Sequence, residues 1–379
     1  MSKRNNILYL TFLFQYPIKK LIRTTFGSYD DTGRILSSLF KQNFIEDKEI
    51  GEIKTIELSP LGREEILSQY PQSAEYDIFI RAKNKGKKNK LRQIKIASIV
   101  QMLNRYVPEY MNEYYDLCIR KINNTLSAGK TRAEKFSNIL SEIEKRKSEN
   151  KNNRFFISVR ELRDMDETRL KNLPSVRASG IFQCETGTYV TYNHLKKRMR
   201  VYGGFEKTFS ETVSELFSGE TVNGIHFGMS YKALYDSIIG AAHGETDSYI
   251  LPSMIYNKQY YVPLTNDGAQ QIQLYTIPDF HKKIRNAIVF RENQKRAKNT
   301  VYDGITEEGD IDYLGFECDY NTIWTLYQNL NSIRSGSDVY IFCFPHQASF
   351  YEKLFGSRAH IHTVAIDQLL RSIAQQEPS

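Results

Sequence analysis

The chain has 379 residues, of which 40% are hydrophobic and 12% aromatic, and this excludes a protein that is disordered throughout. Its 52 lysines and arginines against 44 aspartates and glutamates leave a net charge of +8, which favours a polyanionic partner without proving one. The four cysteines have neither CxxC nor metal-type spacing, so we expect no disulfide, no zinc site and a reducing cytoplasm; they are Cys118, Cys184, Cys318 and Cys343.

A short apolar run at residues 7–14 follows a basic start. No A-x-A-like cleavage site comes after it, and Lys19, Lys20 and Arg23 come instead, so the run does not have the pattern of a signal peptide. No later run approaches the 18 apolar residues of a membrane span. We expect a cytoplasmic protein with no membrane partner.

Three helix-length segments then follow in quick succession. The first, residues 5–15, is apolar on most sides and is expected to be largely buried. The second covers residues 17–27 and ends at a glycine, and the third runs from a cap at residue 28 or 30 to about residue 42. The side chains of the third helix expected to face the core are Ile35, Leu36, Leu39 and Phe40.

Two short strands, residues 45–48 and 52–58, alternate apolar and polar side chains around Gly51 and predict a hairpin. Three helices followed by a hairpin is the order of a winged helix-turn-helix, which places one helix in the major groove of DNA. The side chains expected to face outward from the third helix toward base edges are Tyr29, Thr32, Arg34 and Ser38, and those placed near phosphates by the wing are Lys48 and Lys54.

Three small helices and a hairpin can also form a dimerisation or protein-docking module. Asp30 and Asp31 at the start of the third helix weaken the electrostatic case for DNA locally, although Asp30 can serve as the helix cap. Double-stranded DNA is nevertheless the favoured partner, and a homodimer on a repeated or palindromic site is the arrangement that such domains adopt.

A run of cations without an acidic residue follows between residues 82 and 95. Such a run repels itself and predicts a solvated loop. As an arm on the DNA backbone it would add affinity that falls with salt and carries no sequence information, and a merely soluble linker is the alternative. The lysines assigned to backbone contact are Lys85, Lys87, Lys88 and Lys90.

From residue 91 to about 150 the apolar spacing is helical, with breaks at Pro108 and at residues 127–129. These helices can serve as a brace or as a dimer interface. The charged stretch at residues 144–153 has the composition of a linker, and the main domain boundary is placed there. The predicted domains are the winged helix-turn-helix at residues 1–75, the basic loop and helical connector at 76–153, and an α/β domain at 154–379.

Beyond residue 154 short strand-like runs alternate with helices. The pattern predicts a hairpin over residues 180–192, helices over 205–217, 232–239 and 280–285, and strands over 225–229, 249–256, 259–264 and 271–276. The close predicts a strand at 314–319, a helix to 333, a strand at 338–344, a helix to 355 and a strand at 361–365. Alternation at this spacing implies parallel βαβ units, so the predicted class is a multidomain α+β or α/β protein.

Three carboxylates in this part of the chain can carry chemistry. Asp303 lies in a polar turn, and Glu317 and Asp319 lie two residues apart in the strand predicted at 314–319, where they would share one face. Carboxylates so placed can hold Mg²⁺ for phosphodiester hydrolysis, which makes these three the candidate catalytic and metal-binding residues. Asp279 is an alternative first carboxylate, explained more simply as a helix cap.

With these residues the chain resembles the replication-relaxation family of Gram-positive plasmids and conjugative elements. The matching residues are Leu58-Ser59-Pro60-Leu61-Gly62 after the hairpin, Phe316-Glu317-Cys318-Asp319-Tyr320-Asn321-Thr322 leading into a helix with Leu326 and Tyr327, and the strand Val339-Tyr340-Ile341-Phe342-Cys343-Phe344. The resemblance covers the first domain and the end of the last one. It implies a winged helix followed by a domain related to the PD-(D/E)xK nuclease fold.

The chain departs from the pattern of active nucleases of that wider fold. They usually carry a lysine at the last motif position, where this chain has Asp319, and Tyr302 stands in place of proline before Asp303. An acid in place of the lysine adds negative charge where a phosphate must approach. We therefore expect a nuclease-like fold retained for binding or assembly, with no cofactor.

Other candidates are weaker. His346, His360 and His362 near the last strands can act as general bases but are explained more simply by packing or surface exposure. No glycine-rich nucleotide-binding motif occurs.

The favoured hypothesis is a sequence-specific DNA-binding protein of a mobile genetic element. It would act in plasmid replication, transfer or transcriptional control, with replication or transfer proteins as further partners. The alternatives are a Mg²⁺-dependent DNA nuclease or nicking enzyme using Asp303, Glu317 and Asp319, and a protein-interaction scaffold without a nucleic acid partner.

Overall fold

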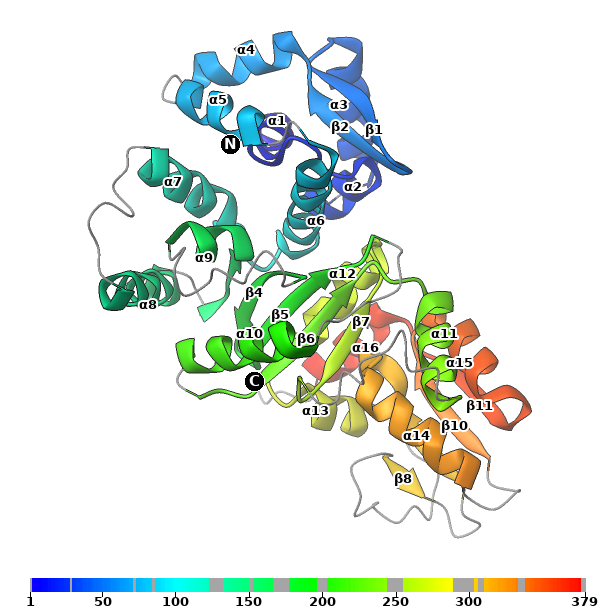
Figure 1. Ribbon diagram of the computed structural model, residues 1–379. Coiled ribbons are helices and arrows are strands. Elements are labelled where there is room, and N and C mark those ends of the chain that lie inside the picture. Colours follow the sequence, from blue (N-terminus) through cyan, green and yellow to red (C-terminus); the bar gives the residue numbers. More distant parts are fainter. Residues whose placement is uncertain are drawn as a thin grey trace. The chain divides into compact units, whose positions relative to one another are not determined.

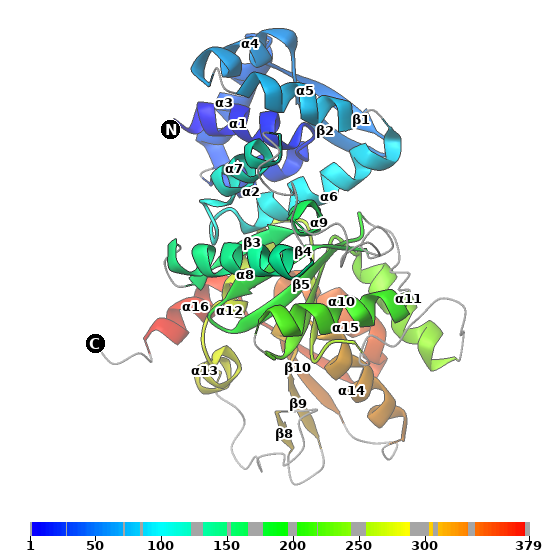
Figure 2. The same ribbon diagram turned by 60° about the vertical axis from the view of Figure 1, so that its left-hand side comes forward.

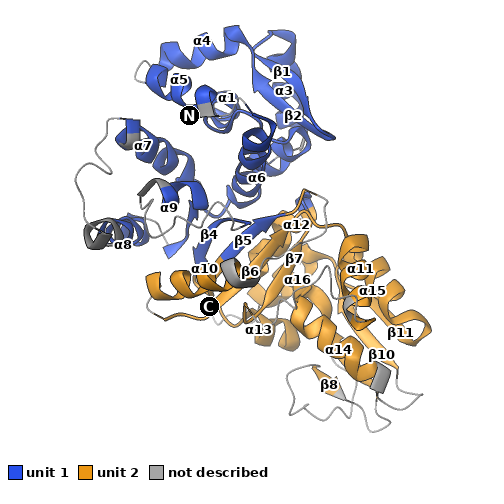
Figure 3. Cartoon of the chain, viewed as in Figure 1, with its two compact units in different colours: residues 1–184, 190–193, 264–266 blue, residues 185–189, 194–263, 267–379 orange. Residues whose placement is uncertain are grey.

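The chain forms a mixed α+β structure, seen here in a computed structural model (Figure 1). The residues described are 2–27, 29–70, 73–83, 86–122, 132–149, 153–165, 177–195, 203–217, 219–243, 255–288, 303–305, 310–332 and 338–375. The chain divides into two compact units (Figure 3): unit 1 comprises residues 1–184, 190–193 and 264–266, and unit 2 comprises residues 185–189, 194–263 and 267–379.

Unit 1 holds mainly helices, together with a small hairpin. Its elements in chain order are α1 (Lys3–Phe14), the 3₁₀ turn η1 (Lys19–Leu21), α2 (Ile22–Phe26), α3 (Tyr29–Lys41), β1 (Ile45–Ile50), β2 (Ile53–Leu58), α4 (Pro60–Gln69), α5 (Ala74–Lys83), α6 (Lys87–Leu103), α7 (Tyr110–Ile122), α8 (Arg132–Glu149), β3 (Phe155–Ser158), α9 (Val159–Met165) and β4 (Ala178–Cys184).

The first helix is the centre of the N-terminal part of unit 1. Ser2 caps α1 by accepting a hydrogen bond from the amide of Asn5, and all residues from Ile7 to Phe14 are buried. They are buried because α3, α4, α6, α7 and β2 all pack against α1. The expectation of a largely buried first helix is confirmed, and α2 ends at Gly27 with φ +66°, as its glycine predicted.

The hairpin β1–β2 is antiparallel, with Ile45 opposite Leu58 and the turn at Gly51. Ser59 then caps α4 by accepting from the amide of Gly62, and Pro60 takes the first helical position. A Cβ atom at Gly62 would lie 1.9 Å from the carbonyl oxygen of Phe44, so this turn needs a glycine. Figure 2 shows α6 beside β1, against which it packs.

Two interpretations of charged stretches in unit 1 are wrong. In the run of cations at residues 82–95, residues 82–83 and 87–95 are helical and do not form the predicted loop, because α5 extends to Lys83 and α6 begins at Lys87. The stretch that begins at residue 144 is not a linker up to Glu149, because it continues α8.

The charge in that part of α8 is paired inside the unit. The guanidinium of Arg146 is 1% exposed and lies 2.9 Å from Glu161, 3.1 Å from Glu142 and 3.5 Å from Glu113. It also donates to the carbonyl oxygen of Phe156 at 2.7 Å. This network joins α7, α8, α9 and β3. Its carboxylates and the carbonyl oxygen offset the cost of removing the Arg146 guanidinium from water.

Unit 2 alternates helices and strands. Its elements are α10 (Gly203–Leu216), β6 (Val222–Phe227), α11 (Tyr231–Ala242), β7 (Gln259–Val262), α12 (Asn266–Tyr275), α13 (Phe280–Ala287), β8 (Gly304–Ile305), β9 (Ile311–Leu314), α14 (Tyr320–Ser332), β10 (Val339–Cys343), α15 (Ala348–Phe355), β11 (Ala359–Thr363) and α16 (Ile366–Ala374). The 3₁₀ turns of this unit are η5 (Gly315–Glu317), η6 (Pro345–Gln347) and η7 (Gly356–Arg358). β5 (Gly187–Asn193) is divided between the units, with residues 187–189 in unit 2 and 190–193 in unit 1, and Asn266 at the start of α12 belongs to unit 1.

The strands form three small sheets. The hairpin β1–β2 is the first, the second has the order β11-β10-β9-β8, and the third has the order β3-β4-β5-β6-β7. In the second sheet β9, β10 and β11 are parallel and β8 is antiparallel at the edge. The predicted parallel βαβ units at the end of the chain are therefore confirmed.

Two strand predictions in unit 2 are wrong and one lies mostly outside the described residues. Residues 271–275 belong to α12, where Gln271, Leu274 and Tyr275 are buried at helical spacing. Residues 315–317 form η5 after β9 ends at Leu314, so Glu317 and Asp319 do not share a strand face. Of the strand expected at 249–256, residues 249–254 lie outside the described residues.

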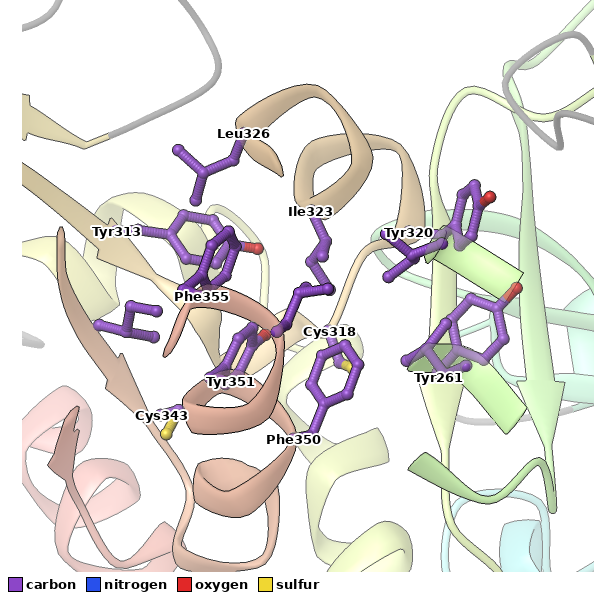
Figure 4. Packing of buried hydrophobic residues seen from close by; sticks show 14 of the residues in the cluster. Tyr261, Tyr313, Cys318, Tyr320, Ile323, Leu326, Cys343, Phe350, Tyr351 and Phe355 are labelled. Atoms are coloured by element: carbon purple, nitrogen blue, oxygen red, sulfur yellow. The ribbon is translucent and has the colours of Figure 1, made fainter. Parts of the chain in front are cut away.

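The core of unit 2 gathers around the parallel strands. Figure 4 shows Phe350 and Tyr351 of α15, Ile323 of α14 and the buried thiol of Cys318 packed together. This packing holds the turn between β9 and α14 in place, and that turn carries Glu317 and Asp319. None of the helices in the described part of the chain combines the length and apolar character that crossing a bilayer requires.

Candidate functional site

The exposed face of α3 is not entirely the one predicted. Thr32 is fully buried and its Oγ1 donates to the carbonyl oxygen of Gly27 at 2.6 Å, so the expectation that it faces outward is wrong. Leu36 and Leu39 share its buried face at helical spacing. The side chain of Tyr29 lies outside the described residues.

The exposed stripe of α3 is polar and continuous. Arg34, Ser37, Ser38 and Lys41 are all exposed and follow one another at i, i+3, i+4 and i+7, which places them on one side of the helix. Arg34 and Ser38 thus lie on the surface as predicted. We call these four residues the α3 stripe.

The hairpin carries more acid than base. Residues 45–58 contain five acidic side chains against two lysines. Lys48 is paired with Glu57 at 2.7 Å, whereas Lys54 is exposed. A surface of this sign repels phosphate, so the electrostatics do not favour the predicted role of the hairpin in backbone contact.

The lysines assigned to the basic arm have different surroundings. Lys87 and Lys88 are exposed in the first turn of α6, and Lys85 lies outside the described residues. Lys90 is only half-exposed, and its Nζ lies 5.6 Å from the ring centroid of Tyr16. The two exposed lysines stand at a helix N-terminus, where the helix dipole adds to their attraction for an anion.

In unit 2, two of the three candidate carboxylates meet on one histidine. His281 of α13 lies with Nδ1 2.6 Å from Glu317 Oε1 and with Nε2 2.8 Å from Asp303 Oδ1. Both carboxylates are buried, at 5–6% side-chain exposure, whereas the imidazole is 45% exposed. The imidazole therefore bridges two buried acids at the surface of the unit.

Two further cations complete this cluster. Lys258, just before β7, places Nζ 2.9 Å from Glu317 Oε2. Arg285, one turn after His281 on α13, donates from Nη2 to Asp303 Oδ1 at 3.2 Å and to its carbonyl oxygen at 2.8 Å. We call His281, Asp303, Glu317, Lys258 and Arg285 the histidine-carboxylate cluster.

The contacts determine the charge states. Hydrogen bonds to Asp303 and then Glu317 raise the pKa of His281 to about 9. Burial raises the pKa of Glu317, but the hydrogen bond from His281 and the charge of Lys258 outweigh it and leave the pKa lowered. Burial alone would lower the pKa of Lys258. The negative charge of Glu317 and the hydrogen bond to it outweigh burial, so the pKa of Lys258 is raised. At neutral pH the cluster holds paired, opposite charges.

Asp319 does not belong to this cluster. Its Oδ1 accepts from the amide of Gln259 at 2.7 Å, and its Oδ2 accepts from the amide and hydroxyl of Thr322 at 3.2 and 2.6 Å. Burial raises the pKa of Asp319. Its position directly before α14 makes it the cap of that helix, so the expectation that it points together with Glu317 from a strand is wrong.

The placement of the carboxylates in the sequence offered a Mg²⁺ site as the alternative prediction, and the arrangement does not fit one. Oδ2 of Asp303 accepts from the amide of Leu314, and the other three oxygens of Asp303 and Glu317 contact His281, Arg285 or Lys258. Within the described residues no group of three or more histidine, cysteine or acidic side chains is arranged to hold a metal ion.

Sequence reasoning missed His281, Lys258 and Arg285. The sequence does place His281 and Arg285 four residues apart, and so on one side of the short helix predicted at 280–285, directly after Asp279. Asp279 precedes α13 at φ +53° and makes no side-chain capping hydrogen bond, so it is not a simple side-chain cap.

The other histidines named from the sequence lie outside the cluster. His346 stacks on Phe344 at 5.7 Å, and His360 and His362 are exposed on the strand β11 and stack on Tyr340 and Phe342. These contacts are those of packing and surface residues.

No protein-family model matches this sequence, and no curated protein or solved structure matches it either.

Proposed function

We propose that the N-terminal part of unit 1 is a winged helix-turn-helix that binds double-stranded DNA through α3. The observation that carries the proposal is the α3 stripe, a solvent-exposed row of Arg34, Ser37, Ser38 and Lys41 on a helix whose opposite face is buried. Arginine and serine are side chains that read base edges, and a helix of this length fits a major groove. The order of three helices and a hairpin supports the same assignment.

The backbone contacts in this proposal come from α6 rather than from the hairpin. Lys87 and Lys88 are exposed, and the hairpin is acidic overall. The acidic hairpin would be kept away from phosphates and would leave sequence recognition to α3. Thr32, which is buried, and Lys48, which pairs with Glu57, carry no part of the proposed interface.

The resemblance to the replication-relaxation family supplies the process. In the proposal the protein belongs to a mobile genetic element, acts in the cytoplasm in plasmid replication, transfer or transcriptional control, and binds as a homodimer. Unit 2 would serve assembly in a nuclease-like fold, with replication or transfer proteins as partners.

Sequencing of the DNA that co-purifies with the full chain tests the proposed function. We expect enrichment of a short site near an origin or a promoter over the input DNA. Recovered DNA that shows no enriched site, or no retained DNA at low salt, would contradict it.

One observation favours a second function, DNA cleavage by unit 2, in which a metal ion would have to displace His281 or Lys258 from the carboxylates. Active nucleases of the PD-(D/E)xK fold usually carry a lysine at the motif position where this chain has Asp319. Here Lys258, from another segment of the chain, places its Nζ 2.9 Å from Glu317. This arrangement supplies a lysine beside Asp303 and Glu317 without using the motif position. Incubation with supercoiled plasmid and Mg²⁺ or Mn²⁺ tests it: nicking that is lost in Glu317→Gln supports cleavage, and an inert wild type rejects it.

A further inference from the structure

Unit 1 contains a polar cavity of about 280 Å³ to which the α3 stripe does not contribute. Its wall comes from the end of α1, from β2, α4 and α5, and from the first turn of α6. Phe12 and Tyr16 supply aromatic surface, and Arg63, Arg81 and Lys90 supply positive charge. Arg81 is 50% exposed, so the cavity can be reached from solvent.

The two acidic residues of the wall already have cations beside them. Asp77 Oδ2 lies 2.7 Å from Nη2 of Arg81, and Glu57 Oε1 lies 2.7 Å from Nζ of Lys48, which is not part of the wall. Each of these pairs is neutral as a whole. Asp77 also lies 3.7 Å from Nε of Arg63 and is therefore shared by two arginines, so the wall carries an excess of positive charge.

Arg63 presents a donor without an acceptor. Its Nε is buried and has no hydrogen-bond partner among the described residues, and the nearest carboxylate oxygen, Asp77 Oδ1, lies 3.7 Å away. That distance is too long for a hydrogen bond. The Arg63 side chain is nevertheless 27% exposed, so an oxyanion in the cavity can contact the accessible part of its guanidinium.

Lys90 places a second positive charge at the same cavity. Its Nζ lies 5.6 Å from the ring centroid of Tyr16, and within the described residues it forms no ion pair with an acidic side chain. An ammonium over an aromatic ring remains available to an anion, because the ring offers only a weak electrostatic partner.

We propose that this cavity binds a small organic oxyanion, with Arg63 and Lys90 holding its phosphate or carboxylate group and Phe12 and Tyr16 contacting its apolar part. The volume lies at the small end of ligand pockets, which suits a small molecule rather than a polymer. This binding function goes beyond DNA recognition and does not depend on it.

Titration calorimetry of the full chain tests the proposal with two probes, inorganic phosphate and acetate, at constant ionic strength set with sodium chloride. We expect saturable binding of at least one probe, and the stronger of the two identifies the group as phosphate or carboxylate. Arg63→Met and Lys90→Met should each weaken that binding by about tenfold or more. Lys207→Met, on the exposed side of α10, removes the same charge elsewhere and should bind as the wild type does.

The proposal is overturned if neither probe saturates, or if both cavity variants bind like the wild type. Far-UV circular dichroism checks that each variant folds, and if Arg63→Met does not fold, the half-exposed Lys90→Met decides. Displacement of the bound probe by any duplex DNA, abolished in Lys90→Met, would instead make the cavity a backbone contact and overturn the small-molecule assignment. Because the titrations contain no DNA, absent probe binding leaves the DNA proposal untouched.

Discussion

The Nδ1 atom of His281 lies 2.6 Å from Oε1 of Glu317. This short contact joins α13 to the turn after β9, and the opposite ring nitrogen of His281 reaches Asp303 in the same way. One imidazole thus links three segments of unit 2. The strength of this link depends on the protonation state of His281, because only the protonated imidazole can donate a hydrogen bond to both carboxylates.

The histidine-carboxylate cluster makes stability depend on pH above neutrality. The folded pKa of His281 is about 9 and its ordinary value is 6.5, so its contribution is fully present below pH 6.5 and is lost as the pH rises through 9. Urea unfolding between pH 6 and pH 10 should show the wild type losing stability over this window, and His281→Gln losing much less.

His243→Gln provides the control for that experiment, because His243 is exposed directly after the end of α11. It should follow the wild-type profile. Identical pH profiles for the wild type and His281→Gln would contradict the bridging role of the imidazole.

The buried network around Arg146 should be a large contributor to the stability of unit 1. Arg146→Met removes the buried cation that Glu113, Glu142 and Glu161 share, although Glu142 keeps its contact with Arg120 at 2.8 Å. Loss of one partner of a buried ion pair typically costs about 3–5 kcal/mol. Lys145→Met on the same helix breaks only an exposed pair with Glu149 at 3.9 Å and should cost about 1 kcal/mol or less. Equal urea midpoints for the two variants would show that the network contributes little.

Asp319 should act as a helix cap and not as a catalytic acid. Asp319→Ala removes the acceptor of the Thr322 and Gln259 amides, which should destabilise the protein by about 1–3 kcal/mol. Asp319→Asn keeps one acceptor oxygen and should lose less. If a nicking activity is detected, it should survive Asp319→Asn, and its complete loss in a folded Asp319→Asn variant would return this residue to the active site.

Local patterns in the sequence were sufficient for much of the fold. The apolar spacing of residues 5–15, the glycine at Gly27 and the alternation around Gly51 predicted α1, the end of α2 and the hairpin. The parallel βαβ units at the end of the chain followed from strand and helix lengths. In these segments local propensity and tertiary packing favour the same structure.

The candidate sites were harder to predict, because they depend on contacts between distant segments. Lys258 and Glu317 lie 59 residues apart in the chain, and no local pattern links them. Arg146 belongs to a charged run that has the composition of a linker, and only the packing of α7, α9 and β3 shows that it is buried. Thr32 has a polar side chain, which predicted an exposed position. It can be buried on α3 because its hydroxyl donates a hydrogen bond to the carbonyl oxygen of Gly27.

The start of α6 should contribute affinity without sequence preference. Replacing Lys87 and Lys88 with glutamine should weaken binding to all duplexes alike and reduce the slope of log affinity against log salt by about 1–2, because each lysine would no longer neutralise a phosphate. Fluorescence anisotropy across a salt series measures this. Lys207→Gln should leave the slope unchanged, and an unchanged slope in the double variant would remove α6 from the interface.

The most direct test of the proposed DNA recognition concerns Arg34. The affinity of the wild type and of Arg34→Ala is measured at one salt concentration for the best duplex selected from a random library and for a scrambled duplex. We predict that the wild type prefers the selected duplex and that Arg34→Ala loses about 1–3 kcal/mol of this preference while keeping its affinity for the scrambled one. A wild type without preference, or an Arg34→Ala variant with the full preference, would contradict the proposal that α3 reads DNA.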